Sequence, residues 1–273
     1  MKRCVGIVCF GLLTALWGCD REAPGNVPVA TPPSPPLPLS PYTYQPCDAD
    51  SSTTVPPGVP SLPGGIWNGR LTNESLKATA PFTALVTEDG RFRFQTDNAR
   101  IVGTVETGEN TFTGDGLAYT WGDWPGFGAP SDFALAGTIN ERDSMAATWS
   151  MASGNAGCFE AGYDADTYEQ PSSLQFVEGF WTEADGWGGS WTVTIEADGH
   201  VSWRDPYDDC DMTGEIALLD DRYNLYEVRH LISGCRPGDE EFTGLAHLSK
   251  SQDVLVLSID NGANGYFDHY WGR

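Results

Sequence analysis

The chain has 273 residues, in which 38 Asp and Glu stand against 15 Lys and Arg, so that the formal net charge is −23. A surface this acidic repels nucleic acid, lipopolysaccharide and anionic lipid. We therefore expect no nucleic-acid partner.

Residues 1–19 have the pattern of a bacterial export signal. Lys2 and Arg3 precede an apolar stretch at residues 5–16, which is shorter than the ~20 residues needed to span a membrane. The segment ends in Leu16-Trp17-Gly18-Cys19. This motif resembles the lipobox of bacterial lipoproteins, and the resemblance implies cleavage after Gly18 and attachment of lipid, with acyl chains such as palmitate, to Cys19.

The lipobox resemblance predicts residues 1–18 as the signal peptide of a protein that faces the periplasm of the bacterial cell envelope, anchored in the inner or outer membrane through Cys19. An ordinary cleaved secretory signal and a transmembrane anchor are the alternatives. Without its signal the chain keeps 13 basic and 38 acidic residues, a net charge of −25.

Residues 19–63 are dominated by Pro, Ser, Thr and small residues, which cannot form a hydrophobic core. We predict a disordered, extended tether, because Pro-rich segments favour the polyproline II conformation.

From residue 64 onward, short alternating runs of Thr, Val, Phe, Tyr and Trp are separated by turn residues, and the pattern occurs twice. Residues 82–86 and 91–94 flank Asp89-Gly90, and residues 191–195 and 200–203 flank Asp198-Gly199. An Asp-Gly pair between alternating runs predicts a β-hairpin. Further matches join Trp67 to Trp181, Gly103 to Gly214 and Gly137 to Gly244.

The repeat predicts an all-β protein with two tandem antiparallel meander β-barrels after the Pro-rich tether. The first barrel would span residues 64–170 and the second residues 171–273, with a connector near residues 167–174. A sheet of about eight short strands per unit leaves no unpaired edge strand if it closes into a barrel. An eight-stranded barrel has room inside for side chains or one small ligand. We expect almost no helix, because apolar residues after the signal lack helical spacing.

Gly65-Ile66-Trp67 and Gly179-Phe180-Trp181, each followed by alternating strands with a glycine at the bends, resemble the start of calycin-type barrels, the lipocalins and avidins. The resemblance implies that Trp67 and Trp181 each plug one end of a barrel. It also implies that Arg273, on the last strand, stacks over a tryptophan.

Four cysteines remain after the signal and the lipidated Cys19: Cys47, Cys158, Cys210 and Cys235. An even number in an exported chain indicates disulfide bonds. Three pairings are possible, and the arrangement of the units favours Cys210–Cys235 and Cys47–Cys158. Metal ligation is disfavoured because the chain has no Cys-x-x-Cys motif and no Cys/His cluster.

No catalytic signature is present, so we expect no enzyme, no cofactor and no metal. Gly-x-Ser-x-Gly and His-Glu-x-x-His are absent, and the acidic residues 205–211 lack the spacing of an EF-hand loop. All four histidines lie in the second unit, where strand alternation could bring two of them together: His200, His230, His247 and His269.

The sequence predicts a non-enzymatic binding lipoprotein, an inhibitor or immunity-type protein that captures a basic protein. The alternative is a calycin-like carrier of a small apolar ligand. The predicted partner-binding residues are the rings of an aromatic loop and acidic side chains of the second unit: Trp121, Trp124, Phe127, Asp208, Asp209, Asp211, Asp239, Glu240 and Glu241. The alternatives to partner binding are that the rings of the aromatic loop plug a barrel and that the acidic charge serves only solubility.

Overall fold

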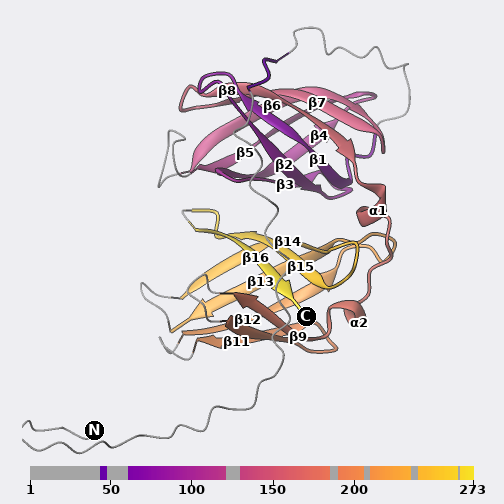
Figure 1. Ribbon diagram of the computed structural model, residues 1–273, viewed down its shortest axis with the longest axis vertical. Helices are drawn as coiled ribbons and strands as arrows, with labels where there is room; N and C mark the ends of the chain where they lie inside the picture. Colours follow the sequence, from indigo (N-terminus) through magenta and orange to yellow (C-terminus); the bar gives the residue numbers. More distant parts are fainter. Residues whose placement is uncertain are drawn as a thin grey trace, which may run out of the picture. The chain divides into compact units, whose positions relative to one another are not determined.

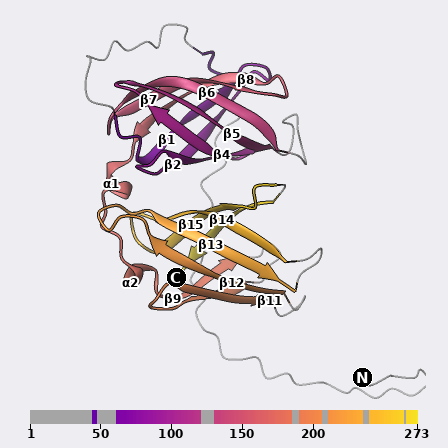
Figure 2. The same ribbon diagram turned by 180° about the vertical axis from the view of Figure 1, so that it is seen from behind.

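The computed structural model describes residues 44–47, 61–120, 130–184, 190–205, 210–234, 239–263 and 265–273. It contains two closed antiparallel barrels of eight strands each, in tandem along the chain (Figures 1 and 2). The prediction of two meander barrels is therefore confirmed.

In the first barrel each strand pairs with the next, and the last pairs with the first. Its strands are β1 (Gly65–Asn73), β2 (Ala78–Val86), β3 (Arg91–Thr96), β4 (Ala99–Thr107), β5 (Thr111–Thr120), β6 (Ser131–Asn140), β7 (Ser144–Met151) and β8 (Ala156–Tyr163).

The second barrel repeats this topology and closes between its last strand and its first. Its strands are β9 (Gly179–Ala184), β10 (Ser190–Ile195), β11 (His200–Asp205), β12 (Cys210–Leu218), β13 (Tyr226–Ser233), β14 (Glu240–Leu248), β15 (Val254–Asp260) and β16 (Tyr266–Gly272).

Two helices of four residues each, α1 (Ala165–Tyr168) and α2 (Leu174–Val177), lie in the connector between the barrels. The side chains of Asp164 and Ser173 cap them by accepting hydrogen bonds from backbone N–H groups of the first turn. No other helix lies in the described part of the chain, as the sequence predicts.

Both Asp-Gly hairpins form where the sequence predicts them. Gly90 and Gly199 have the same positive φ of 88°. Each glycine carbonyl accepts a hydrogen bond from the fourth strand of its barrel, at Val105 and Ile216. A Cβ at Gly90 would lie 2.3 Å from the carbonyl oxygen of Val105, and one at Gly199 would lie 2.2 Å from that of Ile216. Only glycine therefore fits at these two positions.

The tryptophan near the start of each barrel is fully buried and anchored in the same way. The Nε1 of Trp67 donates to the Pro63 carbonyl at 3.2 Å, and that of Trp181 donates to the Val177 carbonyl at 2.7 Å. The expected stacking of Arg273 is present, with its guanidinium 4.6 Å from the Trp181 ring centroid. In the first barrel Tyr163 packs edge-on against Trp67 instead.

The strand register corrects part of the sequence repeat. Gly103 pairs with Gly116 in the first barrel and Gly214 pairs with His230 in the second, so the match of Gly103 to Gly214 is consistent with the register. Following the ladders onward makes Phe133 equivalent to Phe242. The match of Gly137 to Gly244 is therefore wrong by two residues, because both glycines lie in strands of similar composition and the sequence does not fix the pairing.

The tether is stapled to the first barrel by the predicted Cys47–Cys158 disulfide, which joins residues 111 positions apart. Residues 44–47 also bind the barrel through hydrogen bonds. Glu74 accepts from the Cys47 backbone N–H at 2.8 Å, and Thr79 accepts from that of Gln45 at 3.1 Å. The predicted Cys210–Cys235 bond lies outside the described side chains.

The described residues, which begin at residue 44, belong to one compact unit. Arg93 pairs with Asp260, and Arg100 pairs with Asp268, each a nearly buried ion pair between strands of different barrels. These contacts engage one carboxylate of β15 and one of β16, so both already have a basic partner within the chain.

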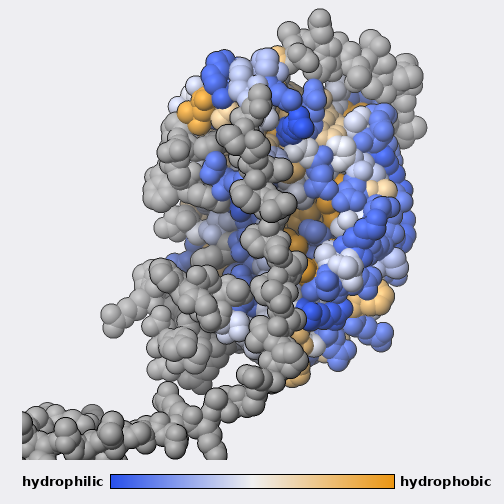
Figure 3. All heavy atoms as spheres, viewed as in Figure 1, coloured by the Kyte–Doolittle hydropathy of each residue, from blue (hydrophilic) through white to orange (hydrophobic). Residues whose placement is uncertain are grey.

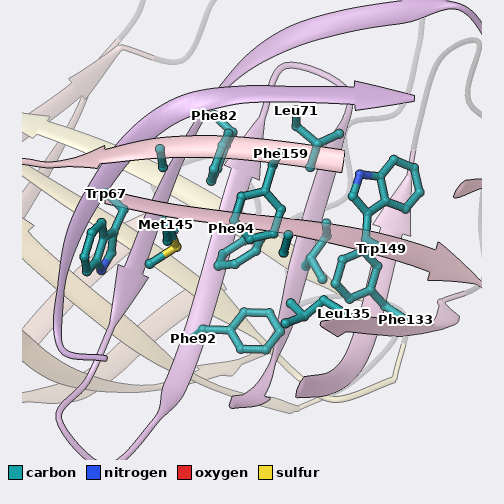
Figure 4. Close-up of a cluster of buried hydrophobic side chains, with 14 of the residues drawn as sticks. Trp67, Leu71, Phe82, Phe92, Phe94, Phe133, Leu135, Met145, Trp149 and Phe159 are labelled. Carbon is teal, nitrogen blue, oxygen red and sulfur yellow. The ribbon is translucent and has the colours of Figure 1, made fainter. Parts of the chain in front are cut away.

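The first lumen is filled by apolar side chains. Phe82, Phe94 and Phe159 form a mutual ring cluster with centroids 5.3–5.6 Å apart. Trp67 lies at one end of the core and Trp149 at the other (Figure 4). Hydrophilic residues predominate among the described atoms at the right of Figure 3, as expected for strands that alternate between a core and solvent.

Candidate functional site

The second lumen differs from the first in chemistry at equivalent positions. Following the strand register, the Phe82, Phe94 and Phe159 cluster corresponds to Trp191, Trp203 and His269. The three phenylalanines are at most 3% exposed, whereas Trp191, Trp203 and His269 are all partly exposed. The same wall of the barrel thus carries hydrogen-bonding rings that solvent reaches.

At three further inward positions, a small side chain of the first barrel is replaced by a polar or aromatic side chain in the second. Gly69, Gly116 and Ala161 of the first barrel correspond, by the register of the ladders, to Glu183, His230 and Trp271 of the second.

Glu183 holds two of the rings in place. Its Oε2 accepts from Nδ1 of His269 at 2.8 Å and from Nε1 of Trp271 at 3.1 Å. These three side chains come from the first and the last strand, β9 and β16, so they assemble only when the barrel closes.

His230 is the most unusual residue of this lumen. Its side chain is fully buried, and neither ring nitrogen has a hydrogen-bond partner. The ring stacks on Trp271 with 10° between the planes and 5.8 Å between centroids. Burial, assisted by the nearby His269, lowers the pKa of His230 to about 3, so the imidazole is neutral at pH 7.

Gly214 makes room for the His230 ring. A Cβ at Gly214 would lie 2.6 Å from Cδ2 of His230 and 2.3 Å from the Arg229 carbonyl oxygen. Trp203 adds another unpaired group, since its Nε1 is buried without a partner. Each such group costs about 1–3 kcal/mol when it is left unsatisfied. The second barrel therefore carries this cost at both His230 and Trp203.

A second candidate site is a groove of about 440 Å³ on the outer face of β11–β14. Leu231 forms an apolar patch there and is 44% exposed. Asp198, Glu215 and Glu241 also line this groove, and Arg229 pairs with Glu241 at 2.7 Å.

The predicted acidic residues differ in their exposure and in the elements to which they belong. Asp211 and Glu241 are exposed but belong to β12 and β14, on either side of β13. Glu240 is only partly exposed and accepts from Asn261, because the alternation of β14 turns it away from Glu241. Asp239 is exposed and accepts from the Gly234 backbone N–H.

The remaining predicted site residues lie outside the described residues: Cys19, Trp121, Trp124, Phe127, Asp208 and Asp209. His230 and His269 are two of the four histidines of the second unit, and the sequence alone indicates no role for them. One signal was available in the repeat: at positions where the first unit has glycine or phenylalanine, the second has histidine.

A larger groove of about 1140 Å³ lies on the outer face of β1 and β6–β8, beside the Cys47–Cys158 disulfide. Small side chains such as Ala146 and Ser144 line it, with Arg70 and Glu160 at the β1–β8 pairing. It shows no chemistry that points to a particular ligand.

The described residues contain no group of three or more His, Cys, Asp or Glu arranged to hold a metal ion. Within the same residues, no helix has the length and apolar character needed to cross a bilayer. Comparison with protein-family models, with curated proteins and with solved structures finds no match to this chain.

Proposed function

We propose that this chain is a non-enzymatic binding protein of the cell envelope that holds a small ligand in the lumen of its second barrel. The observation that carries the proposal is the comparison of the two lumens. One is filled with apolar rings, and the other has tryptophan, histidine and glutamate at the equivalent positions. Ligand pockets combine such apolar walls with a few convergent polar groups.

The proposal gives the other parts of the chain supporting roles. The lipid on Cys19 anchors the protein, the Pro-rich residues before the segment 44–47 hold it away from the bilayer, and the first barrel is a filled structural unit. The Cys47–Cys158 disulfide supports an oxidising compartment such as the periplasm.

Filling the mouth of the second lumen tests this proposal. Ile232 packs against the second core, whereas Leu231, the preceding residue of β13, is exposed on the outer face. Ile232→Trp should weaken binding of uncharged bicyclic aromatic compounds, such as 1-naphthol, at least roughly 10-fold, because one side chain then occupies the ligand's space. Isothermal titration calorimetry on the full chain measures this effect.

Leu231→Trp is the matched control, since it adds the same ring to the outer face and should leave binding unchanged. Equal affinities of the parent and Ile232→Trp, or no binding by the parent, would contradict a ligand site in the lumen.

Capture of a basic protein is the second candidate function, favoured by the exposed Leu231 among carboxylates in the outer groove. Such a groove suits an extended basic segment that carries an apolar residue. Charge complementarity would then accelerate association.

The groove predicts a salt-sensitive interaction. A peptide with one leucine flanked on each side by two lysines should associate with the chain. The double variant Asp198→Asn, Glu215→Gln should associate with this peptide roughly 10-fold more slowly at low ionic strength. The difference should shrink at 0.15 M salt, where the Debye length is about 8 Å. Stopped-flow fluorescence measures the rates, and identical rates for both proteins would leave the charge with a role in solubility only.

A further inference from the structure

The first two strands of the second barrel pair with each other more fully than with the rest of its wall. β9 and β10 pair with each other at six positions. Among the described residues, β9 pairs with β16 at one position, Thr182, and β10 pairs with β11 at two, Thr194 and Ile195. Residues 183–184 and 190–193 therefore pair only within the β9–β10 pair, and we call them its far half.

The first barrel is closed along the same two seams because small residues let its strands approach. There β1 pairs with β8 at seven positions, and β2 pairs with β3 at five. A Cβ at Gly69 would lie 2.0 Å from the Glu160 carbonyl oxygen on β8, so this approach needs glycine. Glu183 occupies the equivalent position of β9, and Trp271 replaces Ala161 on the facing strand. The same close approach is therefore excluded in the second barrel.

Side-chain contacts connect the far half to the neighbouring strands. Glu183 accepts from Nδ1 of His269 at 2.8 Å and from Nε1 of Trp271 at 3.1 Å, both on β16. The ring of Trp191 lies 5.1 Å from that of Trp203 on β11, measured between centroids. A segment with few backbone hydrogen bonds to its surroundings opens locally at a lower free-energy cost than the whole domain unfolds.

The other end of the β9–β10 pair is fixed in the core. Trp181 is fully buried on β9, its Nε1 donates to the Val177 carbonyl, and the Arg273 guanidinium covers its ring. We propose that the far half opens as a gate in the wall of the second barrel while Trp181 holds the base, and that a ligand enters by this route. The route rests on the proposed lumen site, whereas the opening itself does not.

Burial of the lumen side chains is the reason that a ligand needs a gate. His230 and Trp271 are at most 1% exposed, so a molecule can contact their rings only after the wall has moved. Glu183 of the far half bonds to Trp271, which in turn stacks on His230. Movement of the far half breaks this bond and uncovers the rings beside it.

Hydrogen exchange of indole N–H groups, followed by nuclear magnetic resonance on the full chain, tests the opening. Trp271 and Trp181 are matched reporters, because both rings are fully buried in the same barrel and both Nε1 groups donate to an oxygen. The N–H of Trp271 should exchange about 10-fold or more faster than that of Trp181, since local opening exposes only the first. A smaller difference would show that both are reached only by unfolding of the barrel, and would overturn the gate.

Glu183→Ala should increase the open population, because it removes the bonds to β16. The reporter is Trp203, whose Nε1 is buried and whose ring lies against Trp191 of the far half. Its N–H should exchange about 10-fold faster in the variant, with the exchange of Trp181 unchanged. Glu196→Ala is the matched control, since Glu196 is an exposed glutamate directly after β10, and it should change neither rate. Unchanged exchange of Trp203, or equal acceleration of Trp181, would overturn the gate.

Association of 1-naphthol with the full chain, measured by stopped-flow fluorescence, tests the route. Glu183→Ala should raise the association rate constant about 10-fold, because a larger share of the molecules is open, and Glu196→Ala should leave it unchanged. Faster exchange with an unchanged association rate would overturn the gate as the entry route. A parent protein that does not bind 1-naphthol would overturn the lumen site instead, and the exchange rates would still decide whether the gate opens.

Discussion

Replacement of Trp181 by alanine is expected to lower the free energy of unfolding by about 3–5 kcal/mol. Trp181 is fully buried at one end of the second barrel, where its Nε1 donates to the Val177 carbonyl and the Arg273 guanidinium covers its ring. Alanine leaves a large cavity, removes the donor for that carbonyl and exposes the edge of the core. Urea denaturation followed by circular dichroism measures the change.

Phe180 provides the matched control for Trp181. It is the preceding residue of β9 and an aromatic side chain, yet it is 73% exposed. Phe180→Ala should change stability by no more than about 0.5 kcal/mol. If both variants lost the same stability, the tryptophan would not act as a plug, and the loss of any aromatic residue on β9 would be the simpler explanation.

Lowering the pH from 7 to 4 is expected to cost the folded protein roughly 3 kcal/mol through His230 alone. Burial lowers the pKa of His230 to about 3 in the folded protein, whereas a histidine in an unfolded chain titrates near 6.5. Between these two values the unfolded chain binds more protons. The stabilisation is therefore fully present above about pH 6.5 and is lost as the pH falls toward 3.

The measurement compares the parent with His230→Phe in urea denaturation from pH 7 to pH 4. Other groups that titrate in this range contribute to both proteins, so the difference between the two curves isolates His230. The parent should lose roughly 3 kcal/mol more than the variant. Parallel curves would show that the imidazole takes up its proton without leaving the lumen, and that its two nitrogens have partners in solution.

The sequence indicated the roles of Trp181 and His230 to different degrees. The plugs at Trp67 and Trp181 were predicted only through the resemblance of the Gly-x-Trp motif to the start of calycin-type barrels. His230 differs only in that the equivalent position of the first unit is a glycine, and that difference alone does not show that the histidine is buried without partners. A histidine at an inward position of a strand reads like any other polar residue until its neighbours are known.

The sequence by itself determined the strand content, the duplication and the hairpins at Gly90 and Gly199, because alternation and turn chemistry are local properties of the chain. Spacing and unit boundaries were also enough to favour the Cys47–Cys158 disulfide.

Only the tertiary structure decided the register of the later strands, where the match of Gly137 to Gly244 is wrong by two residues. It also decided which side chains meet across the second lumen. Glu183 lies on the first strand of that barrel and His269 on the last, 86 residues apart, and they meet because closure of the barrel brings those two strands together. Contacts made by closure depend on strand pairing around the whole ring, so no local pattern of residues encodes them.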